Sequence, residues 1–398
     1  MDTRPHSDAL VGAVMDGRYR IDAVIATGGT STVYRGLDVR LDRPVALKVM
    51  DARYAGDRDF LARFQREARA VARLKDHALV AVYDQGFDGG HPFLVMELIE
   101  GGTLRELLQE RGPMPPHAVA AVLSPVLSGL AVAHRAGLVH RDIKPENVLI
   151  SDDGDVKIAD FGLVRALAEA KITSTSVILG TAAYLSPEQV GSADVGPRSD
   201  VYSVGILAYE LLTGVTPFHG DSALAVAYAR MDNDVPAPSA AIAGVPRQFD
   251  DLVLAATARI PADRYADAQV MGDELDAIFD ELDLPDFRVP APRNSAQHLS
   301  ATAVNVQVPR DRPTEVTSRP ATGPAPTPRQ HTRELPRDPD DWIDSAPRQF
   351  AGIDMDEFEW ARQRARRAQL FWVIAVLTLT GLIAVGSWSL GSHLNVLL

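Results

Sequence analysis

The chain has 398 residues, more than one ordinary domain requires, and 46% of them are hydrophobic, which suffices for a large core. The formal net charge of −13 argues against direct nucleic-acid binding, because a sequence-independent grip on phosphate depends on clustered Lys and Arg. The absence of cysteine excludes disulfides and thiolate metal sites.

Residues 1–15 form the first expected segment, an N-terminal extension. It holds two Asp and no apolar run long enough for a signal peptide, so we expect no export by that route. From Arg18 to Met96 short apolar runs alternate with Gly and Asp turns, which predicts strands. The stretch from Arg58 to Leu74 interrupts them with apolar residues at helical spacing. We therefore predict a small sheet with one helix.

A glycine pair, Gly28-Gly29, lies inside the predicted sheet, upstream of Lys48. A glycine lacks a Cβ, so backbone N–H groups at Gly28 can approach a phosphate, and Gly29 can relax the turn beside it. Such a pair is also an ordinary hairpin turn, and only its position ahead of Lys48 favours a nucleotide site. Lys48 itself lies in the apolar run Val45 to Val49, where a charged side chain needs a partner.

Longer helical segments dominate from Leu104 onward, including Ala118 to Ala136 and the apolar Val201 to Leu212. They predict a second, helical lobe. Together with the small sheet they place the chain in the α+β class.

The run His140 to Asn147 reads His-Arg-Asp-Ile-Lys-Pro-Glu-Asn, and Asp160-Phe161-Gly162 follows it. Phosphoryl transfer to a hydroxyl requires a group that accepts the hydroxyl proton and divalent metal ions that neutralise the phosphate oxygens. Asp142 suits the first role, and Asn147 and Asp160 supply the oxygen ligands that Mg²⁺ prefers. His140 and Phe161 are expected to pack rather than to react. The ordered set predicts a kinase.

These motifs resemble the eukaryotic-type Ser/Thr protein kinases of bacteria, and in particular the actinobacterial Pkn receptor-like kinases. The resemblance runs from about Tyr19 to about Leu282, and we place the kinase domain at residues 16–284. It implies a two-lobed protein kinase fold that uses ATP and Mg²⁺, with Mn²⁺ as an alternative metal, and acts on proteins. It rests on Val45-Ala46-Leu47-Lys48, Arg66-Glu67-Ala68, the run from His140 to Asn147, Gly180-Thr181-Ala182-Ala183-Tyr184-Leu185-Ser186-Pro187-Glu188-Gln189 and Asp200-Val201-Tyr202-Ser203-Val204-Gly205.

The resemblance also implies roles for individual residues. Lys48 is expected to hold the α- and β-phosphates as an ion pair with Glu67, and Lys144 to neutralise the γ-phosphate and favour Ser/Thr over Tyr. The predicted catalytic residues are thus Asp142, Lys144 and Lys48, and Glu188 and Arg264 resemble the structural ion pair of the helical lobe. The nucleotide-binding residues expected on this basis are Ala26, Gly28, Gly29, Val33, Ala46, Lys48, Glu67, Met96, Glu97, Ile99 and Leu149.

The glycine-rich loop departs from the family pattern. In the family the loop follows the pattern Gly-x-Gly-x-x-Gly-x-Val, whereas in this chain Ala26 and Ser31 replace two of the three glycines. This departure motivates one alternative, a pseudokinase that binds nucleotide without turnover, but Lys48, Asp142 and the predicted metal ligands are intact. A second alternative is a small-molecule phosphotransferase. The long Ser/Thr-rich segment that ends at Glu188 favours a protein substrate instead.

A cluster of hydroxyl residues, Lys171-Ile172-Thr173-Ser174-Thr175-Ser176, lies between Asp160 and Glu188. A solvated loop has the same composition. Thr173 and Thr175 nevertheless align with the activation-loop threonines of the family and are our predicted autophosphorylation sites. Arg141 directly precedes Asp142 and gives an incoming phosphate a cation to bind.

The helical pattern ends after Leu282. Residues 289–348 are rich in Pro, Thr, Arg, Gln and Asp with few aromatics, a composition that buries too little apolar surface to offset chain entropy. We expect a disordered linker over residues 285–353. A basic juxtamembrane helix is expected over residues 354–369, which contain four arginines just before Leu370.

The 21 residues from Leu370 to Leu390 carry no charge, which at ~1.5 Å per residue is enough to cross a ~30 Å hydrocarbon core. Trp372 and Trp388 lie near the ends of the run, where aromatic residues favour the membrane interface. The four arginines predict a cytoplasmic kinase domain on a single-pass membrane helix, with residues 391–398 as a short extracytoplasmic tail. The resemblance further implies docking of forkhead-associated domains on phosphothreonine and pairing of two copies through the small lobe.

Overall fold

The computed structural model describes residues 8–161, 183–191, 194–220, 222–307, 349–350 and 353–354. The chain divides into two compact units, residues 1–310 and 311–398. The described part of the second unit is a short antiparallel pair, β10 (Gln349–Phe350) with β11 (Ile353–Asp354). All other described elements belong to the first unit.

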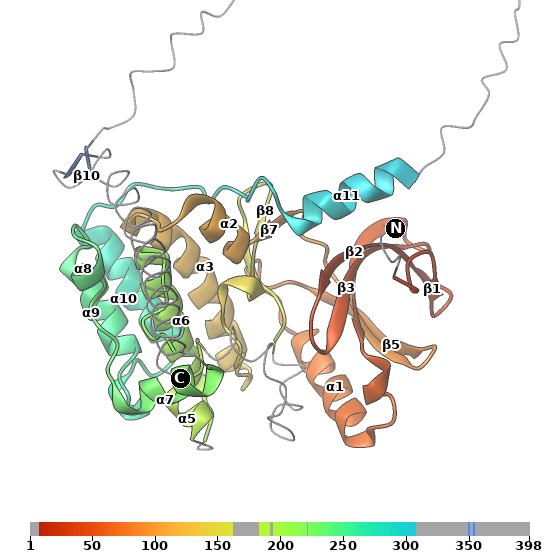
Figure 1. The fold of residues 1–398 in the computed structure, drawn as a ribbon, viewed down its shortest axis with the longest axis horizontal. Coiled ribbons are helices and arrows are strands. Elements are labelled where there is room, and N and C mark those ends of the chain that lie inside the picture. Colours follow the sequence, from red (N-terminus) through yellow and green to blue (C-terminus); the bar gives the residue numbers. More distant parts are fainter. Residues whose placement is uncertain are drawn as a thin grey trace, which may run out of the picture. The chain divides into compact units, whose positions relative to one another are not determined.

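The small lobe is built on an antiparallel sheet that has six strands within the described residues, in the order β1-β2-β3-β4-β6-β5 (Figure 1). The prediction of a small sheet with one helix is confirmed. Its strands are β1 (Val14–Met15), β2 (Tyr19–Thr27), β3 (Ser31–Asp38), β4 (Arg43–Met50), β5 (Val82–Asp88) and β6 (His91–Met96).

The helix of the small lobe is α1 (Arg58–Val71). Asp57 caps its N-terminus, since the Asp57 carboxylate accepts the backbone N–H of Phe60 at 2.9 Å. Phe60, Phe64 and Ala68 recur every fourth residue and are buried in one cluster with residues of β4 and β6. The helix is therefore fixed against the sheet by a single apolar stripe.

The segment before residue 16 belongs to the small lobe. Met15 is buried, and Leu10 and Val11 pack against the same cluster as Tyr19 and Phe93. Tyr34 Oη donates to the Asp8 carboxylate at 3.0 Å. The predicted boundary at residue 16 is therefore too late, because the two residues of β1 pair with β2 and carry their neighbours onto the sheet.

The helical lobe follows a three-stranded sheet, β7 (Gly101–Thr103), β8 (Val148–Ser151) and β9 (Val156–Ile158), in the order β7-β8-β9. Its centre is α6 (Pro197–Thr213), which is buried along nearly its whole length and contacts α3 and α9. This confirms the predicted helical lobe. The remaining helices are α2 (Leu104–Arg111), α3 (Pro116–Arg135), α5 (Pro187–Val190), α7 (Ala223–Asp232), α8 (Pro238–Ala241), α9 (Arg247–Ala256) and α10 (Ala268–Glu281).

Within the described part of the chain, α3 is the one helix that is long and apolar enough to cross a membrane. It is a core helix by position, because 67% of its most apolar stretch is buried inside the fold. The predicted membrane span, Leu370–Leu390, and the basic helix before it lie outside the described residues.

Residues 285–307, which we call the strap, pack back onto both lobes. Ser295 Oγ donates to the carbonyl of Gly101, and the backbone N–H of Ala296 donates to Glu106 Oε1 at 2.8 Å. The strap ends in α11 (Ala296–Gln307), which lies beside β2 and β3 in Figure 1 and contacts both strands.

The prediction that a disordered linker begins at residue 285 is therefore wrong for residues 285–307. Composition alone misses this segment because a few anchors hold it: Val289 is buried, and Ser295 is buried and hydrogen-bonded. Such anchors stabilise a polar stretch that has no apolar periodicity. Residues 308–348 lie outside the described residues.

Candidate active site

Most of the apolar residues among the predicted nucleotide-binding set come together at the junction of the lobes. The ladder places Ala46 of β4 opposite Met96 of β6, and Val33 of β3 opposite Lys48. Met96 and Ile99 are buried in the same apolar cluster as Ala46, and Val33 and Leu149 pack against it. The structure thus gathers five of the six predicted apolar residues into one wall, and Ala26 is not part of it.

Glu97, the residue between Met96 and the lobe connection, is engaged in local structure. Its backbone N–H donates to the carbonyl of Ala81 at 2.9 Å, and its carboxylate pairs with Lys157 at 2.7 Å. The side chain of Glu97 therefore holds β9 to the lobe connection. The Glu97 side chain is thus committed to Lys157, whereas the Ile99 side chain belongs to the apolar cluster.

The glycine-rich loop is a closed turn between β2 and β3. The Gly28 N–H donates to the Ser31 carbonyl at 2.8 Å, and a Cβ on Gly28 would lie 3.3 Å from that oxygen. Arg53 donates to the Gly29 carbonyl, and Ala26 faces Val33 across the ladder. The sequence predicts that the Gly28 N–H donates to a phosphate. In the structure this N–H donates within the turn instead, because a two-glycine hairpin can form an internal hydrogen bond.

Lys48 is buried in β4 and pairs with the carboxylate of Asp160, with 2.8 Å between Nζ and Oδ1. The predicted partner, Glu67, is not within ion-pair distance of Lys48 among the described contacts. A buried ammonium needs a carboxylate in direct contact, and Asp160 supplies one. Burial by itself raises the pKa of Asp160, but Lys48, with smaller contributions from His140 and Lys144, holds that pKa below its usual value.

The base candidate, Asp142, is held by two neighbours of the same loop. Lys144 Nζ lies 2.8 Å from Asp142 Oδ2. Asn147 Nδ2 donates to the Asp142 carbonyl at 2.7 Å and to Asp142 Oδ2 at 3.1 Å. Three residues that the sequence assigned to one reaction are therefore in direct contact, and the Asp142 carboxylate has a fixed orientation.

The predicted metal ligands suit a divalent cation. The Nδ2 atom of Asn147 is committed to Asp142, so the Oδ1 atom is the amide atom that could coordinate a cation. The Asn147 carbonyl accepts the backbone N–H of Ala159 at 2.8 Å, which ties the loop to the residue before Asp160. One amide oxygen and one ionised carboxylate form a hard oxygen donor set. No cluster of three or more His, Asp or Glu that could hold a metal occurs among the described residues.

His140 serves packing, as expected. The Asp142 N–H donates to His140 Nδ1 at 3.3 Å, so the ring proton sits on Nε2, which donates to the Ala159 carbonyl at 3.0 Å. Burial lowers the pKa of His140 below its usual value, against the opposing influence of Asp200. A neutral ring with both nitrogens engaged, 4.7 Å from the Phe161 ring centre, can act neither as base nor as metal ligand.

Asp200, at the start of α6, anchors the catalytic loop and is a residue that sequence reasoning left without a role. Its Oδ2 accepts the His140 N–H at 2.7 Å and contacts His134 Nε2 at 2.9 Å, and its Oδ1 accepts the Arg141 N–H at 2.7 Å. Its side chain is fully buried. The sequence did contain a signal for this role: Asp200 directly precedes the apolar helical run, and a carboxylate buried there needs hydrogen-bond donors.

Two backbone positions at the site are in the left-handed region without being glycine. Arg141 has φ 67° and Asp160 has φ 61°. For residues with a Cβ this conformation costs about 1–2 kcal/mol each. The contacts of Asp200 and Lys48 maintain it.

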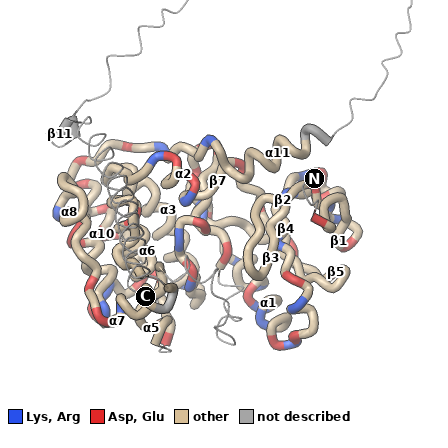
Figure 2. Tube along the Cα trace, in the orientation of Figure 1, with Lys and Arg blue, Asp and Glu red and all other residues tan. Residues whose placement is uncertain are grey.

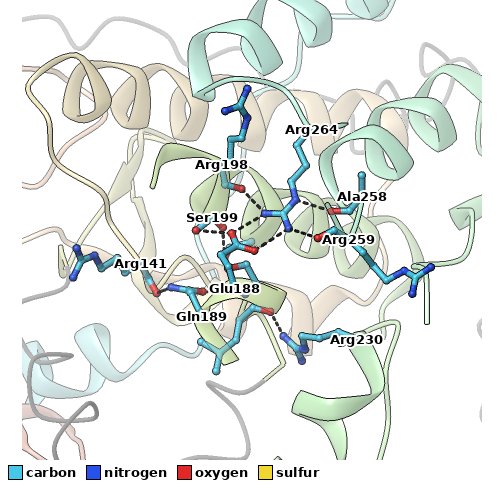
Figure 3. Close-up of polar contacts among 12 residues, drawn as sticks. Arg141, Glu188, Gln189, Arg198, Ser199, Arg230, Ala258, Arg259 and Arg264 are labelled. Atoms are coloured by element: carbon cyan, nitrogen blue, oxygen red, sulfur yellow. Dashed lines mark hydrogen bonds and ion pairs between the residues drawn. The ribbon is translucent and has the colours of Figure 1, made fainter. Parts of the chain in front are cut away.

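The ion pair predicted between Glu188 and Arg264 is confirmed (Figure 3). Arg264 Nη1 and Nη2 lie 2.8 Å and 2.9 Å from the two Glu188 oxygens, and both side chains are buried. Arg264 also donates to the carbonyls of Ala258, Arg198 and Arg259. Burial by itself raises the pKa of Glu188, but the Arg264 guanidinium lowers it below its usual value.

Two further contacts fix the segment that enters α5. Gln189 Nε2 donates to the Arg141 carbonyl at 3.0 Å, and the buried Arg230 donates to the Leu185 carbonyl (Figure 3). The segment around Leu185 is thereby held next to the catalytic loop. The predicted phosphorylation sites, Thr173 and Thr175, lie outside the described residues, as does Gly162.

Comparison with known proteins gives consistent results. Residues 19–274 match the family model described as the protein kinase domain. The chain is 66% identical to the serine/threonine-protein kinase PknL of Mycobacterium bovis and of Mycobacterium tuberculosis, over 98% of this chain and 98% of each relative. The crystal structure of the PknI kinase domain of Mycobacterium tuberculosis is similar at 26% identity and a TM-score of 0.55, covering 68% of this chain and 99% of that chain.

The family uses ATP and a divalent metal ion to phosphorylate proteins. The described site holds the residues predicted for this chemistry in two contacting groups, Lys48 with Asp160, and Asp142 with Lys144 and Asn147. The chain therefore belongs to the protein kinase family, and it is a serine/threonine-protein kinase.

Proposed function

We propose that this kinase transfers the γ-phosphate of ATP, with Mg²⁺ as the metal, to serine and threonine hydroxyls of cytoplasmic proteins while anchored to the cell membrane. The observation that supports this chemistry most directly is the fixed orientation of Asp142 by Lys144 and Asn147. The proposed proton acceptor, cation and metal ligand are residues of one short loop.

Three side chains, those of Asp142, Lys144 and Lys48, have separate proposed roles in the reaction. Asp142 orients the substrate hydroxyl and accepts its proton at the carboxylate. Lys144, in contact with that carboxylate, neutralises the phosphoryl group as it moves toward the hydroxyl. Lys48 contributes a second cation beside Asp160. Mg²⁺, held by Asn147 Oδ1 and Asp160, would supply charge neutralisation on the phosphate oxygens.

The membrane anchor is proposed from the sequence. The uncharged run Leu370–Leu390 has the length of a membrane span, and the four arginines before it favour a cytoplasmic kinase domain. Activation by autophosphorylation of Thr173 or Thr175 is likewise a proposal, supported by the exposed Arg141 beside the base. Pairing through the small lobe and docking of forkhead-associated domains on phosphothreonine complete the proposal.

The test is transfer from labelled ATP by the full-length chain in detergent micelles, alone and with a generic basic protein. We expect Mg²⁺-dependent labelling of the kinase and of the added protein, with phosphoserine or phosphothreonine in acid hydrolysates. Asp142→Asn serves as the control that must remove both signals. Labelling of phosphotyrosine alone, or of small molecules but no protein, would contradict the proposal.

A further inference from the structure

One cluster of charged groups beside the catalytic loop has no part in the chemistry described so far. At its centre is Arg105 of α2, whose three guanidinium nitrogens each have a partner. Nε donates to Glu146 Oε1 at 2.8 Å, Nη1 to Glu210 Oε1 at 2.6 Å, and Nη2 to Tyr184 Oη at 2.6 Å. Tyr184 Oη in turn donates to Glu210 Oε2. One cation is therefore shared by two carboxylates and a phenol.

The partners of Arg105 come from the parts of the fold that surround the transferred phosphate. Glu146 lies between Lys144 and Asn147 in the catalytic loop, and Tyr184 lies just before Leu185, which Arg230 holds. A protein that presents a hydroxyl to Asp142 must pass over this region, because the catalytic loop and the segment leading into α5 are bonded to each other through Gln189. The cluster is thus next to the path of the substrate chain.

The cluster is also reachable from solvent on one side. The Glu146 side chain is 43% exposed and the Arg105 side chain 23% exposed, whereas Glu210 is 6% exposed. Without the Arg105 cation, the two carboxylates and the Tyr184 hydroxyl would form an acidic recess with acceptors already in place. Such a recess matches a guanidinium or ammonium group of a substrate side chain.

We propose that Arg105 occupies in cis the position that a basic substrate side chain would otherwise fill, so that Arg105 is a specificity-determining residue that keeps this kinase from selecting basic proteins. The Arg105 guanidinium already takes Glu146 Oε1, Glu210 Oε1 and the Tyr184 hydroxyl, and a nearby substrate arginine meets the positive charge of Arg105. The acidic composition of the chain as a whole does not offset this, because acidic and basic residues are interspersed in both lobes (Figure 2).

The inference rests on the proposed phosphorylation of protein hydroxyls, and the test separates the two. A reference peptide with one threonine and no basic residue is compared with peptides in which a single arginine stands at each position from four before to four after the threonine. The measured quantity is the ratio of kcat/KM for each arginine peptide to kcat/KM for the reference. Transfer to the reference peptide reports the kinase activity independently of the ratio.

For the natural chain we expect ratios near one at every position. In Arg105→Ala the ratio should rise about tenfold or more at one or two positions, since a charge-assisted contact is gained there. Adding Glu146→Gln to that variant should remove most of the gain, because the exposed carboxylate is lost. Arg111→Ala is the matched control: Arg111 ends the same helix, its contact with Glu110 is 4.0 Å, and its loss should leave the ratios unchanged.

Unchanged ratios in a folded, active Arg105→Ala chain would overturn the proposal, as would an equal gain in Arg111→Ala. If the alanine variant does not fold, Arg105→Gln keeps the stem and one donor and carries the same expectation at smaller amplitude. Failure of both variants to fold would show that the cluster only stabilises the fold, and this result would also overturn the proposal. Ratios of kcat/KM well above one in the natural chain would overturn the proposal directly.

Discussion

Removing the guanidinium of Arg264 should destabilise the kinase strongly without touching a catalytic group. In Arg264→Met the Glu188 carboxylate remains buried, with Ser199 Oγ at 2.6 Å as its remaining side-chain donor, and three backbone carbonyls lose their donors. Breaking a buried pair from one side costs about 3–5 kcal/mol. With ~2.1 cal/mol/K per residue of unfolding entropy over the roughly 300 residues of the first unit, that is a fall in Tm of about 5–8 °C.

Glu188→Gln should cost less, because Arg264 keeps its three carbonyl partners. The double variant Arg264→Met with Glu188→Leu should recover part of the loss, since no buried charge is left. The assay is thermal unfolding of the full-length chain by circular dichroism, with the exposed Arg247→Met as control. A drop below about 2 °C in Arg264→Met, or additive losses in the double variant, would refute the reasoning.

The sign of the pH dependence follows from the Glu188 pKa. In the natural chain that pKa is lowered on folding, so its contribution is complete above the unfolded value near 4.3 and is lost as pH falls through the lower folded value. In Arg264→Met only the Ser199 and backbone hydrogen bonds still oppose burial, which is the largest influence on Glu188, so its folded pKa should lie above the unfolded one. The gap in Tm between the two proteins should therefore narrow as pH falls from 8 toward 5.

Asp142→Asn should lower transfer about a hundredfold or more, because a positioned proton acceptor is lost. The Tm should stay within a few degrees of that of the natural chain, since the contacts with Lys144 and Asn147 are mostly kept. Activity above a tenth of normal would argue against Asp142 as the base. Thr173→Ala with Thr175→Ala should reduce transfer to a protein substrate more than ATP affinity; mass spectrometry that finds no phosphate on residues 173–176 would remove the activation proposal. A chain that ends at Gln307 should match the full-length kinase in activity. One that ends at Leu284 should unfold at a lower temperature, because it lacks the buried Ser295 and Val289 contacts of the strap. Equal Tm values for the two shortened chains would show that the strap contributes nothing to thermal stability.

Much of this fold could be predicted from the sequence because its signals are local. The period of Phe60, Phe64 and Ala68 predicts a helix, and the order of Lys48, Asp142 and Asp160 predicts a kinase before any contact is known. The residues predicted to share the chemistry could be proposed from the sequence because the reaction itself dictates their types, and their roles stay a prediction. Their contacts confirm that they converge.

What could not be predicted depends on contacts between distant segments. The partner of Lys48 is decided by which carboxylate lies within reach, and spacing along the chain does not encode that distance. Arg105 gives no signal in sequence, since a surface helix carries arginines for many reasons, and only the fold brings it to Glu146 and Glu210. The strap is held by single anchors rather than by a periodic pattern, so composition places it in a linker.

The left-handed backbone at Arg141 and Asp160 sets a limit on how this kinase can be improved. A search for sequences of greater thermal stability would replace both by glycine or asparagine, which adopt that conformation at lower cost. At Asp160 that choice deletes the carboxylate that pairs with Lys48, and at Arg141 it deletes the cation beside the base. At these two positions the backbone favours one residue and the proposed function needs another, so a search for stability that ignored activity would remove both side chains.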